Sequence, residues 1–246
     1  MAQKKIRLDQ LLVERGLCES RTRAAAFIME GRVSVGGQTI DKPGTRVNEE
    51  AQVAVQKPPH PFVSRGGLKL QNALEHFGLD ARGLVALDAG CSTGGFSDCL
   101  LQRGVARVFA ADVSPEQLHE RIKVDPRVLL LPPTNVRHLK PSDLPGLVDL
   151  VVGDLSFISL RLLLPALEAV LRPGGKMLLL IKPQFEVGRE KVGRGGIVRD
   201  ERARLEAVAR VIEAAASIGL SHLGTVQADP PGTDGNIEFF VCFSKP

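Results

Sequence analysis

The first 57 residues carry a helical pattern of apolar positions followed by a strand pattern. Apolar residues recur at helical spacing over 7–17 and again over 21–30, and a glycine ends each stretch. Ser20 precedes the second stretch at an N-cap position. Short apolar runs around Gly36-Gly37 then predict hairpin strands at 32–35, 38–40, 47 and 52–55. We therefore expect a small α+β domain here.

Beyond residue 64, short apolar runs alternate with longer amphipathic stretches. The predicted strands are 84–88, 107–111, 127–131, 148–153, 176–181, 223–228 and 237–243. The predicted helices are 67–77, 95–103, 115–122, 160–170 and 200–218. Strands separated by helices predict a doubly wound α/β sheet that is mostly parallel. Because no helix joins the last two strands, we expect one antiparallel strand in this Rossmann-like fold.

A proline-rich segment separates the two parts of the chain. Lys57-Pro58-Pro59-His60-Pro61 holds three prolines, which fit poorly into a helix or a paired strand and favour an extended linker. The expected boundaries are 1–57 for the small domain, 58–63 for the linker and 64–246 for the α/β domain.

The positive charge is concentrated near the start of the chain. Residues 1–60 hold 10 basic and 7 acidic residues, so they contribute +3 of the formal charge of +4. This excess could meet phosphates, although an ordinary solvated surface would look the same. Arg21 and Arg23 lie in the first turn of a predicted helix, where they oppose the helix dipole. An anionic partner would explain their position.

Composition also limits the class of protein. The four cysteines, Cys18, Cys91, Cys99 and Cys242, are irregularly spaced and predict reduced thiols with no zinc site. No stretch is apolar enough for a membrane span, and no apolar region precedes a cleavage site near the start. We expect a cytoplasmic protein that requires no metal and enters no membrane. Because Trp and Tyr are absent, stacking on a base must use Phe, His, Arg or aliphatic groups.

An apolar strand that ends at an acid and enters a glycine-rich turn predicts a ligand pocket. The acid is Asp88, and the turn contains Gly90, Gly94 and Gly95. Ligands of open α/β sheets bind at the carboxyl ends of the strands. The turn lacks the G-x-G-x-x-G spacing of dinucleotide-binding proteins, and a carboxylate is poorly suited to a phosphate. A cationic or zwitterionic ligand such as S-adenosylmethionine fits better.

Two further residues could complete this pocket. Asp112 ends the second strand, 24 residues after Asp88, where its carboxylate could accept both hydroxyls of a ribose. Asp112 could equally be an acid that begins the next helix. Asn135, after the third strand, is a candidate for the pocket wall.

Two lysines and two acids are expected at the same edge of the sheet. Asp154 follows the fourth strand, Lys182 follows the fifth, Lys69 lies in the first helix of the domain, and Glu238 lies in the last strand. A lysine at the end of an apolar strand is costly unless it is paired. Burial and a second lysine nearby favour the neutral amine that a general base needs. Two structural Lys–carboxylate pairs are the alternative explanation.

Five motifs around these residues resemble the TlyA branch of the FtsJ-like ribose 2'-O-methyltransferases. They are Ser64-Arg65-Gly66-Gly67-x-Lys69-Leu70, Asp88-x-Gly90-x-Ser92-Thr93-Gly94-Gly95-Phe96, Asp154-Leu155-Ser156-Phe157, Lys182-Pro183-Gln184-Phe185-Glu186 and Gly235-Asn236-x-Glu238. The resemblance implies a methyltransferase fold and S-adenosylmethionine-dependent methylation of cytidine 2'-hydroxyls in ribosomal RNA. It also implies a catalytic Lys-Asp-Lys-Glu tetrad of Lys69, Asp154, Lys182 and Glu238, in which Lys182 is the general base.

The cofactor-binding residues expected from the pattern and the resemblance together form one set. They are Asp88, Gly90, Ser92, Thr93, Gly94, Gly95, Phe96, Asp112, Val113, Asn135 and Asp154. The chain departs from the family pattern over 113–118, which lacks the glycines expected after the ribose acid, and at Pro132-Pro133.

The N-terminal segment resembles the RNA-binding module named after ribosomal protein S-four. The motifs are Arg7-Leu8-Asp9-x-x-Leu12, Gly16-Leu17-x-x-Ser20-Arg21, Gly31-x-Val33-x-Val35 and Lys42-Pro43-Gly44. The resemblance implies that the second helix and a neighbouring loop contact structured RNA. The expected RNA-contacting residues are Lys4, Lys5, Arg7, Arg21, Arg23, Lys42 and Arg65.

Two other functions compete with ribosomal RNA methylation. Proteins of the TlyA type have been labelled haemolysins, but the chain has no span and no long basic amphipathic helix. A ribosomal RNA-binding assembly factor without turnover is the other alternative. Base identity depends on RNA shape, so the sequence leaves the modified nucleotide and the choice of ribosomal subunit open. A monomer is favoured.

Overall fold

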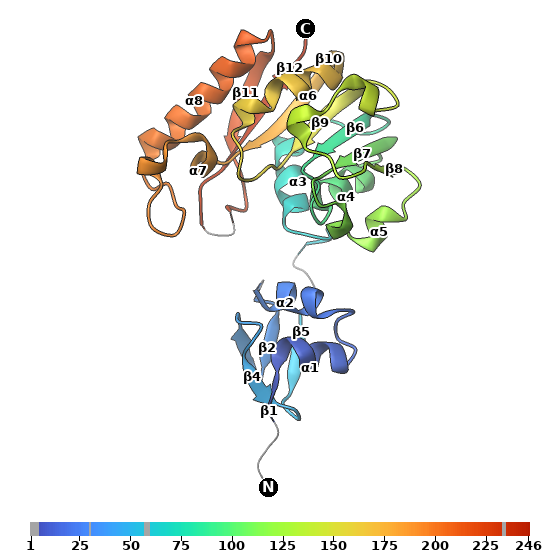
Figure 1. The fold of residues 1–246 in the computed structure, drawn as a ribbon, viewed down its shortest axis with the longest axis vertical. Helices are drawn as coiled ribbons and strands as arrows, with labels where there is room; N and C mark the ends of the chain where they lie inside the picture. Colours follow the sequence, from blue (N-terminus) through green and yellow to red (C-terminus); the bar gives the residue numbers. More distant parts are fainter. Residues whose placement is uncertain (1–4, 30, 57–59, 233–234) are drawn as a thin grey trace. The chain divides into compact units, whose positions relative to one another are not determined.

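The structure is a computed structural model that describes residues 5–29, 31–56, 60–232 and 235–246. The chain forms two compact units, residues 1–61 and 62–246 (Figure 1). The predicted linker, 58–63, spans the division, and its residues 58 and 59 lie outside the described ranges.

The smaller unit consists of two short helices and five three-residue strands. The helices are α1 (Leu8–Glu14) and α2 (Arg21–Met29), and the strands are β1 (Lys5–Arg7), β2 (Val33–Val35), β3 (Gln38–Ile40), β4 (Arg46–Asn48) and β5 (Val53–Val55). The predicted N-cap of α2 is confirmed, because the Ser20 hydroxyl oxygen accepts a hydrogen bond from the backbone N–H of Arg23 at 3.2 Å. Leu8, Leu12 and Ile28 are fully buried between the elements and form the core of the unit.

One strand of this unit was not expected from the sequence. Residues 5–7 pair with β4 in antiparallel register, and β2, β3 and β5 form a separate three-stranded sheet. Because β1 runs directly into α1, its three residues fall inside the apolar helical pattern that begins at residue 7. A strand this short leaves no alternation of its own in the sequence.

The larger unit is built on a seven-stranded sheet, and its strand order places the predicted antiparallel strand. The strands are β6 (Val85–Ala89), β7 (Arg107–Ala111), β8 (Val128–Leu130), β9 (Val148–Gly153), β10 (Leu171–Ile181), β11 (Ser221–Gln227) and β12 (Phe239–Ser244). Their order is β11-β12-β10-β9-β6-β7-β8. β12 is antiparallel to both of its neighbours, whereas β10, β9, β6, β7 and β8 pair in parallel. The predicted α/β class and the antiparallel strand are therefore confirmed.

Helices cover both faces of this sheet (Figure 1). They are α3 (Gly66–His76), α4 (Gly95–Gln102), α5 (Glu120–Lys123), α6 (Leu164–Val170), α7 (Pro183–Glu186) and α8 (Glu201–Ser217). Alternate residues of each strand face opposite layers, so that Ala86 packs with α3 and α4 while Leu87 packs with α6 and α8. The strands are therefore apolar on both faces, which explains why the sequence shows them as continuous apolar runs.

The predicted helix over 115–122 is wrong in detail. Residues 115–117 form a short 3₁₀ turn, Leu118 is extended, and α5 begins only at Glu120. Leu118 leaves the helical conformation and is 2 % exposed, packed beneath the turn at Gly94, where an added Cβ would lie 2.7 Å from its side chain. Burial of one leucine has divided the helix in two.

All four cysteines are free and buried. Cys18 belongs to the core of the smaller unit, and Cys91, Cys99 and Cys242 belong to one core layer of the larger unit. Burial raises the pKa of Cys99 to about 12 and that of Cys242 to about 11. The thiols are therefore protonated near neutral pH.

Candidate active site

The carboxyl ends of β6 and β9 meet where the strand order reverses. β7 and β8 continue from β6 in one direction, whereas β10 and β12 continue from β9 in the other. The turn after β6 touches the loop after β9, because a Cβ on Gly90 would lie 3.0 Å from the carbonyl oxygen of Asp154. Gly90 also has a φ of +81°, which favours glycine. This is the position at which open α/β sheets bind ligands.

Asp88 supports the glycine turn from below. Its side chain is fully buried, and Oδ2 accepts hydrogen bonds from the backbone N–H and the hydroxyl of Ser97, at 2.9 and 2.6 Å. Oδ1 has no hydrogen-bond partner among the described residues. Burial raises the pKa of Asp88 to about 7, against the lowering effect of the Ser97 bonds. Asp88 lies beneath the cavity described next and does not line it.

A cavity of about 430 Å³ lies above this turn, between β6, β7 and β9. The predicted cofactor residues that line it are Gly90, Ser92, Asp112, Val113, Asn135 and Asp154. The carboxylate of Asp112 is held by the backbone N–H groups of Ser92 and Ser114, at 2.8 and 2.9 Å. Among the described residues that line the cavity there are two carboxylates and no lysine or arginine. We call this cavity the acidic cavity, and its charge favours a cationic ligand over a phosphate.

The remaining predicted cofactor residues lie around the turn itself. Thr93, Gly95 and Phe96 line an adjoining hollow of about 210 Å³ that also contains Asp154 and Lys182. Gly94 has a φ of +92° and faces Leu118. The structure thus places nine of the eleven predicted cofactor residues along two connected hollows, with Asp88 and Gly94 supporting them from within the protein.

Lys182 and Asp154 form the first pair of the predicted tetrad. Lys182 lies directly after β10 and before α7, and its Nζ is 2.6 Å from Oδ1 of Asp154. The same ammonium donates a hydrogen bond to the hydroxyl of Ser156 at 2.7 Å. Both side chains are only partly exposed, at 13 % and 26 %. The pair therefore borders the hollow next to the acidic cavity while remaining accessible to a ligand.

Lys69 and Glu238 form the second pair. Lys69 extends from α3 to Glu238, just before β12, and its Nζ donates to Oε2 at 2.6 Å. The two side chains are 10 % and 4 % exposed, so this pair is more deeply buried than the first.

A second cavity relates the two pairs to each other. This cavity, about 310 Å³ in volume, is lined by Lys182 from the first pair and Glu238 from the second. We call it the tetrad cavity. Phe157 also lines it, with a φ of +65° and 91 % of its surface exposed, and its ring lies 5.2 Å from that of Phe185. The predicted tetrad thus forms two ion pairs that each contribute one residue to the same cavity.

Glu186 is a residue near the site that the sequence did not single out for a role. It lies on α7, is 3 % exposed, and accepts hydrogen bonds from the backbone N–H of Leu160 and the hydroxyl of Ser159, both at 2.6 Å. Burial raises its pKa, while these hydrogen bonds and Arg161 lower it. Glu186 therefore fastens the helix after Lys182 to the loop that follows Asp154. The acid in Lys-Pro-Gln-Phe-Glu was its only signal in the sequence.

In the smaller unit, two of the expected RNA-contacting arginines share one buried acid. Asp9, 4 % exposed, accepts a two-pronged contact from Arg7, at 3.0 and 2.8 Å, and a contact from Arg21 at 3.2 Å. The bond from Arg7 is the main cause that lowers the pKa of Asp9 to about 2. The two guanidinium groups remain about half exposed, so they are oriented and still open to a partner.

The other expected RNA-contacting residues lie in different surroundings. Arg23 lies 5.1 Å from the centre of the Phe27 ring, and Lys5 and Lys42 are exposed. Arg65, in the larger unit, donates to the carbonyl oxygen of Pro231 at 3.2 Å. Lys4 lies outside the described residues.

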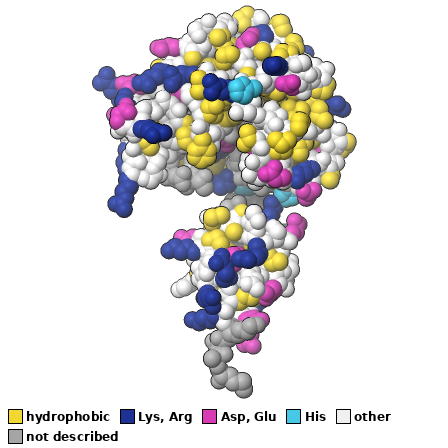
Figure 2. Space-filling model, viewed as in Figure 1, with side chains coloured by type: hydrophobic (Ala, Val, Ile, Leu, Met, Phe, Trp, Pro, Cys, Tyr) yellow, Lys and Arg dark blue, Asp and Glu magenta, His cyan; other side chains and the backbone are white. Residues whose placement is uncertain are grey.

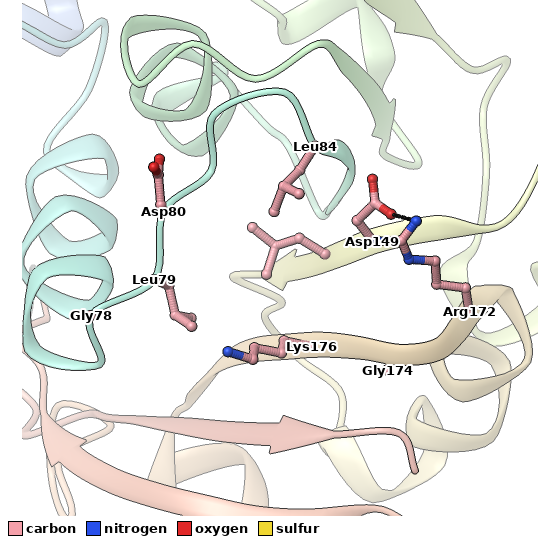
Figure 3. A pocket seen from close by; sticks show the side chains of 9 residues that line it. Gly78, Leu79, Asp80, Leu84, Asp149, Arg172, Gly174 and Lys176 are labelled. Carbon is pink, nitrogen blue, oxygen red and sulfur yellow. Dashed lines mark ion pairs between the residues drawn. The ribbon is translucent and has the colours of Figure 1, made fainter.

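Another cavity opens at the opposite, amino-terminal edge of the sheet (Figure 3). It measures about 240 Å³ and contains none of the predicted site residues. Asp149 pairs with Arg172 there and also accepts a hydrogen bond from the backbone N–H of Val85 at 2.6 Å. These contacts join the starts of β6, β9 and β10, so we interpret the region as a structural junction.

Metal and membrane sites were searched in the same structure. The described ranges contain no group of three or more His, Cys, Asp or Glu side chains that could hold a metal ion. None of the helices in the described part of the chain is both long and apolar enough to cross a membrane.

Two families of known proteins match the two units. Residues 62–245 match the family described as FtsJ-like methyltransferase, and residues 6–53 match the S4 domain. The first match covers well over half of the chain and contains all four residues of the predicted tetrad.

Individual relatives match over nearly the whole chain. A 16S/23S rRNA (cytidine-2'-O)-methyltransferase, TlyA of Mycobacterium tuberculosis, is 44 % identical over 97 % of this chain and 89 % of its own length. A solved structure from Streptococcus thermophilus, described as a hemolysin, superimposes with a TM-score of 0.78 at 39 % identity, over 99 % of this chain and 90 % of that chain.

A more distant structure matches the larger unit in fold alone. The N-methyltransferase NodS of Bradyrhizobium japonicum, in complex with S-adenosyl-l-homocysteine, gives a TM-score of 0.53 at 18 % identity. The match covers 73 % of this chain and 87 % of that chain.

Proposed function

The chain belongs to the FtsJ-like methyltransferase family and carries an N-terminal S4 domain, and on this basis we propose that it methylates cytidine 2'-hydroxyls in ribosomal RNA. The reaction and substrate are those named for its relative from M. tuberculosis. The observation that supports the proposal most directly is the Lys182–Asp154 pair at 2.6 Å, which stands between the acidic cavity and the tetrad cavity.

The acidic cavity fits S-adenosylmethionine as the methyl donor. Asp112, held by two backbone N–H groups, would accept hydrogen bonds from the ribose hydroxyls, and Asn135 would contribute to the wall around the base. The carboxylate of Asp154 would lie on the side of the cation. When bound, this cofactor supplies a methyl group made electrophilic by its positive sulfur.

Lys182 is the proposed general base. Its neutral amine would accept the proton of the ribose 2'-hydroxyl as the oxygen forms its new bond to carbon, and the amine would become an ammonium. Asp154 and Ser156 already contact Nζ, so they would stabilise that ammonium and fix its direction. The Lys69–Glu238 pair would present Glu238 on the other side of the tetrad cavity and orient the nucleotide.

The S4 domain is proposed to supply the first contact with RNA. Arg7 and Arg21, oriented by Asp9, would meet phosphates together with Lys5, Arg23, Lys42 and Arg65. Lys4, which lies outside the described residues, belongs to the same proposed set.

The decisive experiment measures transfer of labelled methyl from S-adenosylmethionine to purified small and large ribosomal subunits, followed by digestion to nucleosides. We expect label in 2'-O-methylcytidine. Label in another nucleoside would reject the proposed substrate. No transfer to either subunit, with the cofactor bound, would favour a non-catalytic assembly factor.

The role of Lys182 is tested by Lys182→Met, which keeps the length of the side chain and removes its basicity, and by Lys182→Ala. Both variants should lose about 10²–10⁴-fold in kcat, the usual contribution of a general base, and should bind cofactor and RNA as before. Turnover at the wild-type rate in either variant would reject Lys182 as the base.

A further inference from the structure

The segment between α7 and α8 borders the tetrad cavity and has no part in the proposed chemistry. We call residues 188–199 the basic loop. It contains four basic residues and one acid: Arg189, Lys191, Arg194 and Arg199 against Glu190. Two of its other residues, Val192 and Gly196, line the tetrad cavity together with Lys182 and Glu238.

A buried side chain fixes the basic loop in this position. Asn236 is 2 % exposed and lies two residues before Glu238. Its Oδ1 accepts a hydrogen bond from the backbone N–H of Val198 at 3.0 Å, and its Nδ2 donates to the carbonyl oxygen of Gly196 at 2.9 Å. The loop is therefore fastened to the same short segment that carries one of the tetrad acids.

Two arginines of the loop are open to a partner. Arg194 and Arg199 are exposed, and neither forms an ion pair with any residue in the described ranges. Lys191 differs, because it lies 2.7 Å from Glu206 on α8 and so attaches the loop to that helix. Figure 2 shows Lys and Arg side chains gathered on the side of the larger unit that carries α7 and α8.

The charges of the tetrad cavity explain why such a loop would be useful. A 2'-hydroxyl that reaches Lys182 belongs to a nucleotide with a phosphate on either side. Glu238 lines the same cavity and Asp154 borders it, and both repel those phosphates. Positive groups at the rim would offset this repulsion, and arginine is well suited to phosphate.

We propose that the basic loop is a second RNA-binding surface, which contacts the phosphates next to the target nucleotide through Arg194 and Arg199. This inference rests on the proposed function, since it assumes an RNA substrate. The surface acts within the catalytic unit, and it seats the target strand after the S4 domain has bound the RNA.

The test replaces Arg194 and Arg199 with Glu in the full chain. The control is Arg82→Glu with Arg107→Glu, which changes the net charge equally at exposed positions before β6 and at the start of β7. Methyl transfer to purified ribosomal subunits is measured over a range of salt concentrations, alongside cofactor affinity and thermal unfolding.

We expect the loop variant to raise KM for the subunits at least 10-fold, with kcat within about twofold and cofactor affinity unchanged. Its salt dependence should weaken by up to about two phosphate contacts, at roughly 0.7–0.9 in log–log slope for each. Arg194→Gln with Arg199→Gln should show a smaller effect of the same sign. The control should resemble the wild type.

Equal KM values and equal salt slopes in the loop variant and the control would overturn the inference while leaving the proposed function intact. Failure of the wild-type protein to methylate RNA at all would instead reject the proposed function.

Discussion

Asp88 illustrates how a single buried carboxylate supports the site. Its position at the end of a strand was predictable from the apolar run before it, and so was its place beside a glycine turn. Its surroundings were not predictable, because Ser97, which binds one of its oxygens, lies on the following helix and faces inward. The other oxygen has no partner among the described residues, and this makes the ionised form costly.

Asp88→Asn should change how stability depends on pH. The folded-state pKa of Asp88 is raised to about 7 from a model-compound value of 3.8, so the folded protein holds this proton between about pH 4 and pH 7 while the unfolded chain releases it. The contribution of Asp88 to stability therefore falls as pH rises through this window. Asn keeps an acceptor for Ser97 and cannot ionise.

The measurement is the midpoint of thermal unfolding of both proteins from pH 5 to pH 8.5. The advantage of Asp88→Asn over the wild type should grow up to about pH 7–8 and then level off. Parallel curves would show that the carboxylate does not titrate in this window.

The tetrad shows the same limit of sequence reasoning. Strand ends predicted that Asp154, Lys182 and Glu238 would reach one edge of the sheet. Which lysine binds which acid depends on side-chain direction and on the path of α3, and neither leaves a periodic signal. The pairing of Lys69 with Glu238 and of Lys182 with Asp154 therefore required the structure.

At the scale of elements, the first turns of α3 and α4 pack unusually closely. A Cβ on Gly67 would overlap the Phe62 ring and would lie 2.8 Å from the carbonyl oxygen of Gly95. A Cβ on Gly95 would overlap the hydroxyl of Ser64. Glycine at both positions thus allows α3 to carry Lys69 next to the cofactor turn.

Gly67→Ala should destabilise the protein by about 1–3 kcal/mol, as expected for added volume in a packed core. Gly146→Ala is the matched control, because a Cβ there has no neighbour within 4 Å. Urea unfolding would measure both, and methyl transfer would report whether Lys69 is displaced. Equal stability of the two variants would mean that the two helices separate at little cost.

Most elements were predictable, and the exceptions share a physical cause. The strands of the large sheet and the helix α8 follow long, regular apolar patterns and lie where the sequence predicts. The helix expected over 115–122 and the strand β1 do not follow their patterns. In both cases, contacts with a distant segment, Gly94 for Leu118 and β4 for β1, outweigh the local preference.

At the scale of the whole molecule, two units of different chemistry are joined in one chain. The S4 domain presents arginines organised around Asp9, whereas the larger unit holds its charges in ion pairs around two cavities. Division of the chain was predictable from the prolines between the units. The use of Asp9 as a common acceptor was not, because its two partners are two and twelve residues away on different elements.

Arg21→Ala with Arg23→Ala should weaken binding to ribosomal subunits and reduce its salt dependence by up to about two phosphate contacts. Methyl transfer at saturating RNA should change little, because both arginines belong to the smaller unit. Binding is measured by filter retention at several salt concentrations. Arg46→Ala, an exposed change on β4, serves as the control. An affinity equal to that of the control would remove the S4 domain from the RNA site.

The four enclosed cysteines make the protein report on its own unfolding. The chain has no Trp or Tyr, so its intrinsic fluorescence reveals little about its state. Alkylating reagents attack thiolates, and burial keeps these thiols both protonated and covered. One thiol belongs to the smaller unit and three belong to the larger one. The mass gained during a brief exposure to such a reagent therefore distinguishes opening of the first unit, by a single adduct, from opening of the second, by three.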